Sequence, residues 1–342
     1  MNAVVANSAA PAVLEAVDLV KHYPVRGGFF APPRHVHALD GVSFALAAGE
    51  TLAVVGESGC GKSTLARCLM RLEEPTSGRI VLAGRDITHL ARGELRGLRR
   101  TMQIVFQDPY ASLNPRWSIG SIVGDPIRLH EPLAREARRA RVAELLETVG
   151  LGAEYMDRHP HELSGGQRQR VAIARAIAVS PSVVICDEPV SSLDVSIQAQ
   201  VVNLLKRLQR SLGMAYVFIS HNLALVGHIS DRVAVMYLGQ VVELAEARAL
   251  RGRRLHPYSQ ALFSAAPVAD PDAAAKKTRI ILTGDVPSPV DPPSGCRFRT
   301  RCPYAQERCA TEPPALRAVE GRFVRCHFAG DAGFAPEPGT PA

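Results

Sequence analysis

Short runs of apolar residues alternate along the chain with segments in which apolar positions recur every three or four residues. Four runs predict buried strands, since each is five or six residues long and almost wholly apolar; they cover residues 51–56, 102–106, 182–186 and 215–220. Between the second and third run, residues 108–179 have helical periodicity and no comparable strand. The pattern therefore predicts an α/β sheet domain with a long helical insertion.

The pattern changes toward both ends of the chain. We expect residues 1–12, which are alanine-rich and unpatterned, and residues 331–342 to be disordered tails. A proline-rich stretch at 286–293 precedes a segment rich in cysteine. We therefore expect a main domain over residues 13–255 and a small cysteine-containing extension over residues 256–330.

The composition limits the class of protein. A chain of 342 residues with 46% hydrophobic residues can bury a large core. No run approaches the roughly 18 apolar residues of a membrane span, and the N-terminus lacks the features of a secretory signal, so we expect a cytosolic protein. Thiols stay reduced there, and the seven cysteines are an odd number, which disfavours a disulfide framework. The net charge of +7 selects no partner, because the arginines are interspersed with acidic residues.

The stretch GESGCGKST, residues 56–64, matches the pattern G-x-x-x-x-G-K-[ST] between a predicted strand and a helix-forming segment. Its glycines let consecutive backbone N–H groups point at phosphate oxygens. Lys62 can reach the β- and γ-phosphates, and the Ser63 hydroxyl can bind Mg²⁺. The motif predicts a site for ATP and Mg²⁺ made by Gly56, Glu57, Ser58, Gly59, Cys60, Gly61, Lys62, Ser63 and Thr64.

A pair of carboxylates follows the predicted strand at 182–186. Asp187 and Glu188 stand at the carboxyl end of this strand, where an α/β sheet places its ligand crevice. Asp187 can hold Mg²⁺, and Glu188 can polarise the attacking water. Such a pair alone is often a solvated turn, and the phosphate loop upstream favours the catalytic interpretation.

A second phosphate-ready helix start lies in LSGGQRQRVAIARA, residues 163–176. This stretch closely resembles the signature motif of ABC-transporter ATPases. Gln107 in FQDP, Asp194 in SSLD and His221 in ISHN match the family's order, together with the phosphate loop and the strand ICDEP. The resemblance covers about residues 13–250. It implies a P-loop NTPase fold with a RecA-like core, an antiparallel β subdomain and a helical subdomain at about 108–179.

The resemblance also implies roles for these residues. In the family two nucleotide domains pair head to tail, and each ATP is clamped between one P-loop and the partner's signature motif. Gln107 would contact Mg²⁺ and the attacking water, and His221 would hold the γ-phosphate. Tyr23, in KHYPV, is either the adenine-stacking residue or a packing residue. The clamp on the partner's ATP would be formed by Ser164, Gly165, Gly166 and Gln167, with Asp194 at the dimer seam.

Four longer stretches resemble the dipeptide/oligopeptide importer ATPases, the DppF/OppF type in particular. They lie at residues 38–67, 107–116, 186–200 and 256–262. The resemblance implies import of peptides at the cytoplasmic face of the membrane, as a peripheral subunit. Two permeases, a second homologous ATPase and an extracytoplasmic peptide-binding protein are the implied partners. Import of another solute such as nickel stays open, whereas a soluble nucleic-acid-linked ABC ATPase is disfavoured by the single signature motif, so we expect no nucleic-acid partner.

Cys296, Cys302, Cys309 and Cys326 are separated by five, six and sixteen residues. Structural zinc sites usually begin with a tight C-x₂₋₄-C pair, which this segment lacks. Four thiolates can ligate a [4Fe–4S] cluster, and importers of this type have been associated with one. We favour the cluster over zinc and over four reduced thiols. Of the other cysteines, Cys60 lies in the phosphate loop, where an alkylating reagent would block nucleotide, and Cys68 and Cys186 are expected in the core.

Overall fold

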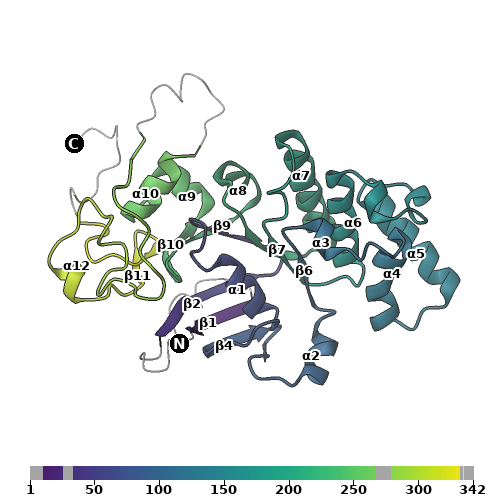
Figure 1. The fold of residues 1–342 in the computed structure, drawn as a ribbon, viewed down its shortest axis with the longest axis horizontal. Helices are drawn as coiled ribbons and strands as arrows, with labels where there is room; N and C mark the ends of the chain where they lie inside the picture. Colours follow the sequence, from purple (N-terminus) through teal and green to yellow (C-terminus); the bar gives the residue numbers. More distant parts are fainter. Residues whose placement is uncertain (1–10, 26–33, 267–278, 332–333, 335–342) are drawn as a thin grey trace.

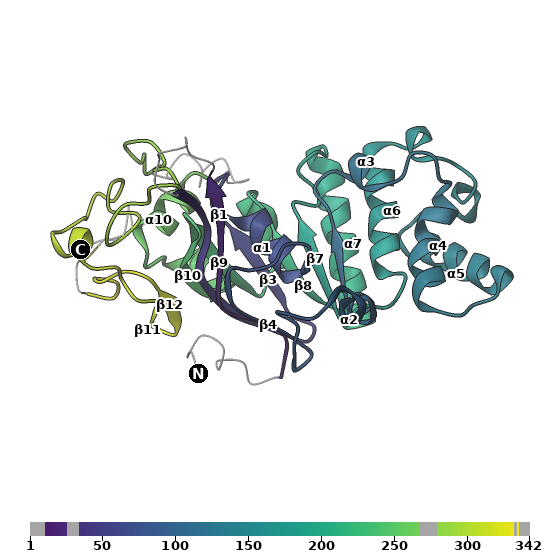
Figure 2. The same ribbon diagram turned by 60° about the horizontal axis from the view of Figure 1, so that its bottom comes forward.

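The computed structural model describes residues 11–25, 34–266, 279–331 and 334. The expected tails at 1–12 and 331–342 lie almost entirely outside the described residues. The first strand already begins at Ala12. Figures 1 and 2 show the predicted helical block at one end of the molecule and the cysteine-containing extension at the other, with the sheets between them.

A small antiparallel sheet forms the N-terminal part of the fold. Its strand order is β2-β1-β4-β5, with β1 at Ala12–Val25, β2 at Arg34–Ala47, β4 at Ser77–Leu82 and β5 at Arg85–Asp86. Leu14 pairs with Leu46 across β1 and β2, and both side chains are fully buried. This sheet is the antiparallel β subdomain that the family resemblance implied.

The main sheet has eight strands in the order β11-β12-β10-β9-β3-β8-β7-β6. Strands β3, β6, β7, β8 and β9 are parallel, and the first four coincide with the four predicted strands, which are confirmed. Because the parallel strands run in one direction, their carboxyl ends meet at one edge of the sheet. The bounds are β3 Thr51–Val55, β6 Met102–Val105, β7 Val183–Asp187, β8 Ala215–Ile219, β9 Arg232–Tyr237, β10 Gln240–Glu246, β11 Arg317–Val319 and β12 Arg322–Val324.

Both faces of the main sheet are covered. Alternate residues of β3 show this, because Leu52 and Val54 face the core shared with helix α1 and the small sheet, whereas Ala53 and Val55 face the other helices. A strand buried on both faces is apolar at every position, which explains the continuous apolar runs in the sequence. The covering helices are α1 Lys62–Leu69, α7 Val195–Leu212 and α8 Leu223–Ile229.

The predicted helical insertion is confirmed. Between β6 and β7 the described chain contains helices and no strand. Residues Val142, Leu145 and Leu146 bury one face of α5 against the neighbouring helices. The elements are α3 Pro109–Ser112, α4 Ile119–His130, α5 Arg135–Thr148, the 3₁₀ turns η1 Ala153–Tyr155 and η2 Pro160–Glu162, and α6 Gly165–Ile177, with α2 Arg92–Leu98 ahead of β6.

The C-terminal extension joins the main sheet directly. Strand β12 pairs antiparallel with β10, Glu243 opposite Val324 and Leu244 opposite Phe323, and β11 adds the outermost strand. Helix α9, Ala247–Gly252, precedes the extension, which also contains α10 Pro257–Ser264 and α12 Arg308–Thr311. The predicted boundary at residue 256 falls between α9 and α10 and stays a prediction. Among the described residues, no helix is long and apolar enough to cross a membrane.

Candidate nucleotide-binding and cysteine sites

The phosphate loop connects β3 to α1, as its sequence predicted. Gly61 lies at φ 107° just before the helix, and a Cβ there would stand 2.2 Å from the carbonyl oxygen of Ala38. Only glycine fits this combination of backbone angle and close approach. Lys62 is buried, and its ammonium donates to the carbonyl oxygens of Gly56 at 2.9 Å and Glu57 at 3.0 Å. The lysine charge is thus held inside the loop that a triphosphate would enter.

A cavity of about 630 Å³ opens over this loop. Residues from the small sheet, the phosphate loop and the carboxyl ends of the parallel strands line it together, as the sequence predicted. It is lined by Tyr23, Val36, Ala38, Ser58, Gly59, Gly61, Lys62, Ser63, Thr64, Gln107, Glu188, His221 and Pro289. The cavity is large enough to hold a nucleotide.

Glu188 is the centre of a polar group in this cavity. Its Oε2 accepts a hydrogen bond from Nε2 of Gln107 at 3.2 Å and lies 3.2 Å from Nδ1 of His221. The three residues follow β7, β6 and β8, which are neighbours in the sheet, and this explains how they meet. Glu188 also has a left-handed φ of 46°, an unfavourable conformation that often marks a functional residue. A carboxylate held this way can take a proton from water.

Asp187 and Ser63, the two residues predicted to bind Mg²⁺ at the phosphate loop, lie within hydrogen-bonding distance of each other. The Ser63 hydroxyl donates to Oδ1 of Asp187 at 3.3 Å. Burial raises the pKa of Asp187, and the hydrogen bond from Ser63 works against that rise. A divalent cation between these oxygens would reverse the effect of burial, because it favours the charged carboxylate. The donor set of a hydroxyl and a carboxylate suits Mg²⁺.

Tyr23, on β1, lines the wall of the cavity. Its hydroxyl hydrogen-bonds to the Glu73 carboxylate, and burial together with this bond raises the pKa of Tyr23 to about 12. The hydroxyl is therefore anchored while the ring borders the cavity. This position accommodates both the stacking and the packing interpretation.

The signature residues do not line this cavity. Ser164 caps α6, where its Oγ accepts from the Gln167 N–H at 3.3 Å and its own N–H donates to Oε1 of Gln167 at 2.9 Å. A Cβ at Gly166 would lie 2.7 Å from a methyl of Ile197 in α7, so the two helix starts pack closely. Asp194 caps α7. The structure thus brings one set of predicted residues to the P-loop and places the signature set apart from it, on the helical block (Figure 1).

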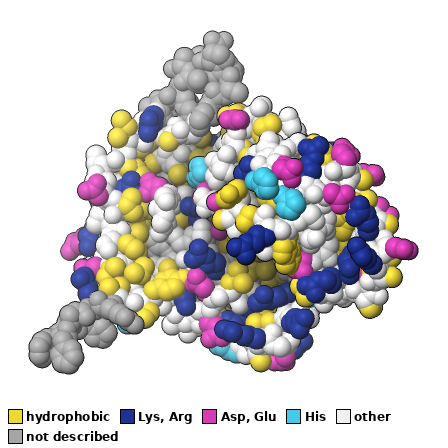
Figure 3. Space-filling model, turned by 45° about the vertical axis from the view of Figure 1, so that its right-hand side comes forward, with side chains coloured by type: hydrophobic (Ala, Val, Ile, Leu, Met, Phe, Trp, Pro, Cys, Tyr) yellow, Lys and Arg dark blue, Asp and Glu magenta, His cyan; other side chains and the backbone are white. Residues whose placement is uncertain are grey.

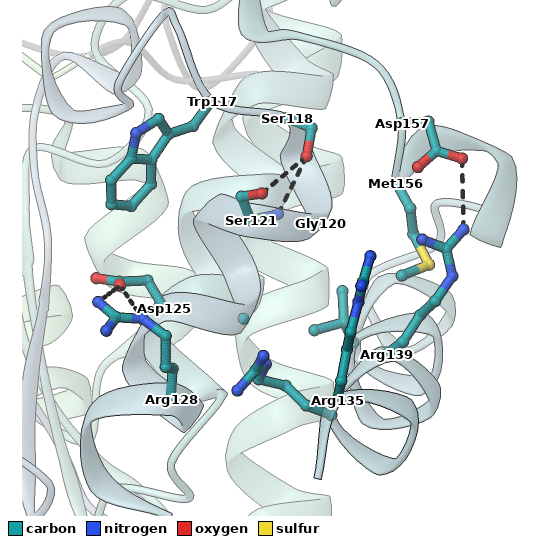
Figure 4. A pocket seen from close by; sticks show the side chains of 13 residues that line it. Trp117, Ser118, Gly120, Ser121, Asp125, Arg128, Arg135, Arg139, Met156 and Asp157 are labelled. Carbon is teal, nitrogen blue, oxygen red and sulfur yellow. Dashed lines mark hydrogen bonds and ion pairs between the residues drawn. The ribbon is translucent and has the colours of Figure 1, made fainter. Parts of the chain in front are cut away.

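A second hollow, which the sequence did not reveal, lies on the helical block. It has a volume of about 460 Å³ between α4, α5 and η1. Figure 4 shows Trp117 and Ser118 on one side and arginines of α5 on the other, with Arg128 paired to Asp125 at 2.7 Å and Arg139 to Asp157 at 3.4 Å. Basic side chains are spread over this end of the molecule (Figure 3). Trp117 is the single tryptophan of the chain, which is the one sequence signal that could have drawn attention here.

The four cysteines of the extension come together through its loops. Gly295 has φ 61°, and a Cβ there would stand 2.3 Å from the carbonyl oxygen of Cys309, which accepts the Cys296 N–H at 2.8 Å. Burial raises the pKa of the Cys296 thiol to about 11 and that of Cys302 to about 12, and the neighbouring thiols add to both shifts. Burial also raises the pKa of Cys326, with Cys309 adding to the shift. The thiols are thus close enough to influence one another electrostatically.

The spacing of the sulfur atoms bears on the kind of metal that fits. Zinc binds thiolates at about 2.3 Å in a tetrahedron, which holds sulfur atoms about 3.8 Å apart. Among the described residues, one group of three or more potential metal ligands has all its ligand atoms within 4.8 Å of one another. It consists of His22, His37 and Asp40. No three of the four cysteine sulfurs therefore reach the spacing that a single zinc ion needs. The guanidinium of Arg297 contacts Asp40, so a cation at the histidine group would meet a positive charge.

The remaining cysteines are buried, as expected for Cys68 and Cys186. The Cys60 thiol lies beneath the phosphate loop, 3.9 Å from the Lys62 ammonium, and only 4% of the residue is exposed. Burial raises the pKa of Cys60. An alkylating reagent would have to open the loop to reach this thiol, because the sulfur faces the core and not the cavity.

Comparison with known proteins gives two family matches. Residues 39–191 match the ABC transporter family, and residues 242–309 match the C-terminal region of oligopeptide/dipeptide transporters. The first match spans the P-loop, the signature motif and strand β7 with Glu188 directly after it. The second includes α10 and three of the four cysteines of the extension.

Similar proteins cover nearly the whole chain. The di/tripeptide transport ATP-binding protein DppF of Pseudomonas aeruginosa is 53% identical, over 93% of this chain and 98% of its own length. The oligopeptide transport ATP-binding protein OppF of Escherichia coli is 50% identical, over 92% and 95%. Among solved structures, the dimer of the ATP-binding cassette MJ0796 bound to ADP and Pi has a TM-score of 0.62 at 29% identity, covering 69% of this chain and 99% of that one.

Proposed function

The chain belongs to the ATP-binding subunits of ABC transporters, in the oligopeptide/dipeptide group, and from this premise we propose that it hydrolyses ATP to drive the uptake of di- and oligopeptides. The observation that carries the proposal is the arrangement of Lys62, Glu188 and His221 around one nucleotide-sized cavity. A matching relative of near-equal length supports the peptide substrate.

Each residue of the cavity would have a separate role in ATP hydrolysis. Lys62 offers its ammonium to the phosphates, and Ser63 with Asp187 would hold Mg²⁺, which when bound neutralises charge on the β- and γ-phosphates. Glu188 accepts the proton of the attacking water, since its Oε2 is oriented by Gln107 and His221 at 3.2 Å each. His221 is exposed beside Glu188 at the cavity, and it would hold the γ-phosphate. Tyr23 would stack on adenine.

The separation of the signature motif from this cavity supports a dimer with shared sites. The start of α6, with its capped N-terminus and two glycines, presents backbone N–H groups that suit an anion. Because these groups do not line the chain's own cavity, they would clamp ATP bound to a partner ATPase, with Asp194 at the seam. The solved dimer of a similar cassette with ADP and Pi is consistent with this arrangement. We propose a second homologous ATPase as the partner.

The hollow on the helical block supports a permease-docking role. Its lining begins at Trp117, a short distance along the chain from Gln107. A mixture of apolar and charged lining residues, including Trp117, Val142, Met156 and paired arginines, suits a short amphipathic helix. Two membrane permeases and an extracytoplasmic peptide-binding protein would complete the importer, and the chain would sit peripherally at the cytoplasmic face of the membrane.

For the four cysteines an iron–sulfur cluster is proposed in preference to zinc, because no three of their sulfur atoms lie within 4.8 Å of one another. A [4Fe–4S] cluster takes its four thiolates on four different irons, so it accepts sulfurs spaced more widely than a single zinc ion does. The raised thiol pKa values of Cys296 and Cys302 indicate desolvated sulfurs that a bound metal centre would stabilise as thiolates. We propose that these residues with Cys309 and Cys326 hold such a cluster, which would brace the extension.

The experiment that tests the function uses the assembled complex. The chain should copurify with its two permeases and a second ATPase, and ATP hydrolysis by the complex in lipid should rise when peptide and its binding protein are added. Stimulation by nickel or another solute, with no response to peptide, would assign the same ATPase to a different importer.

A further inference from the structure

The segment between Cys296 and Cys302, with the sequence CRFRTRC, contacts the nucleotide domain through the side chains of Arg297, Phe298 and Arg301. Phe298 is 2% exposed, and its ring packs on Tyr237 of β9 and Tyr258 of α10, with centroid distances of 5.2 and 5.5 Å. The segment is therefore anchored on the main sheet, although it is far from the phosphate loop in the sequence.

Arg301 reaches from this anchored segment to the phosphate loop. Its Nη1 donates to Oε2 of Glu57 at 2.8 Å, and its Nη2 donates to Oε1 at 3.2 Å. This two-pronged contact is the strongest geometry that arginine and carboxylate can form. The Arg301 side chain is 9% exposed and that of Glu57 is 29% exposed, so water screens the pair only weakly.

Glu57 is held at its backbone as well. Its N–H donates to the Tyr258 hydroxyl at 2.9 Å, and its carbonyl accepts from the Lys62 ammonium at 3.0 Å. Glu57 thus links the extension to the lysine that meets the phosphates. A shift of Glu57 would therefore move its carbonyl oxygen, which accepts a hydrogen bond from the Lys62 ammonium.

The charge of Glu57 makes the contact important for binding. A carboxylate in a loop that receives a triphosphate repels the ligand unless another group cancels its charge and directs it away. Arg301 does both, because its guanidinium pairs with both carboxylate oxygens. Among the hydrogen bonds of the described residues, Arg301 is the one cationic side chain bound to the Glu57 carboxylate.

From these contacts we infer that Arg301 is a positioning residue of the nucleotide site, which neutralises and orients Glu57 and so makes ATP affinity depend on how the cysteine-containing extension is seated. The inference rests on the proposed ATPase function. Because Arg301 directly precedes Cys302, a displacement of Cys302 would shift Arg301 and change its contact with Glu57 in the phosphate loop.

The test measures ATP binding by the full-length chain with Mg²⁺, using a fluorescent ATP analogue displaced by ATP. Arg301→Met should bind ATP about tenfold more weakly, since it leaves a partly buried carboxylate unpaired beside the ligand. Arg299→Met is the matched control, because Arg299 lies in the same segment and, among the described residues, its side chain hydrogen-bonds only to Ser294. It should bind within about twofold of wild type.

A second variant separates positioning from loss of structure. Adding Glu57→Gln to Arg301→Met removes the unpaired charge, so ATP affinity should recover to within about threefold of wild type. Thermal unfolding of each variant checks that it is folded.

Unchanged affinity in Arg301→Met, equal losses in the Arg299 control, or no recovery in the double variant would each overturn the inference. Failure of the wild-type chain to bind ATP would instead refute the proposed function.

Discussion

Replacing Glu188 with glutamine should stop hydrolysis and leave ATP bound. Glutamine has the shape of glutamate, so it can keep a contact with Gln107 or His221, each 3.2 Å from Oε2 in the native site. It also keeps the left-handed backbone at φ 46°, at the same cost. What it loses is the ability to take a proton from water.

The size of the effect follows from that single loss. A positioned general base contributes about 10²- to 10⁴-fold to rate, or roughly 3 to 5 kcal/mol of activation free energy. We therefore expect phosphate release from prebound ATP to slow by at least about 100-fold, with ATP affinity unchanged or tighter. The trapped ATP should hold the dimer closed.

The assay is single-turnover phosphate release, paired with light scattering to measure ATP-dependent dimerisation. Glu144→Gln serves as the control, because Glu144 is exposed on α5 and its one ion pair within the described part of the chain is with Arg141. Its turnover should match that of the wild type. A Glu188→Gln protein that turns over within tenfold of wild type would refute the assignment of Glu188 as the base.

Three further changes probe the clamp, the extension and the cysteine site. Gly165→Asp should impair hydrolysis at the site that holds the partner's ATP, because it adds negative charge at the start of α6. In mixed dimers of variant and wild-type chains, a hydrolysis defect confined to the variant's own P-loop would contradict the clamp model. His256 is buried, its Nδ1 accepts the Tyr258 N–H at 3.1 Å, and burial lowers its pKa from 6.5 to about 3. At pH values between these two pKa values, only the unfolded chain binds a proton at this histidine. The free energy of unfolding should therefore fall by about 2 kcal/mol from pH 7 to pH 5. In denaturant titrations at each pH, the unfolding free energy of His256→Asn should fall less, because the contribution of this histidine is gone. Protein purified without oxygen should contain iron and acid-labile sulfide, and Cys302→Ser should lose both; zinc or no metal in the wild type would exclude the cluster.

Local features of the fold could be predicted from the sequence. The strands at 51–56 and 215–220 are buried on both faces, so nearly every residue is apolar, with the polar Thr51 and Ser220 at the ends of the two runs. The P-loop was predictable because its glycines and lysine are dictated by backbone geometry and phosphate charge. The same holds for Asp187 and Glu188, whose place at a strand end follows from the sheet.

Contacts between distant segments could not be predicted. The pairing of β12 with β10 depends on two short strands with no distinctive pattern, and it makes the extension part of the main sheet. The contact of Arg301 with Glu57 joins residues 244 positions apart. An arginine among other arginines carries no local signal of its partner, so only the folded chain identifies which one reaches the phosphate loop.

The most direct test of the central claim is uptake of a labelled dipeptide by cells in which the native chain is replaced by either the wild type or Glu188→Gln. We expect normal uptake with the wild type and loss of uptake with the variant, at equal protein levels. Equal dipeptide uptake by both strains would contradict the claim that hydrolysis at this site powers peptide import.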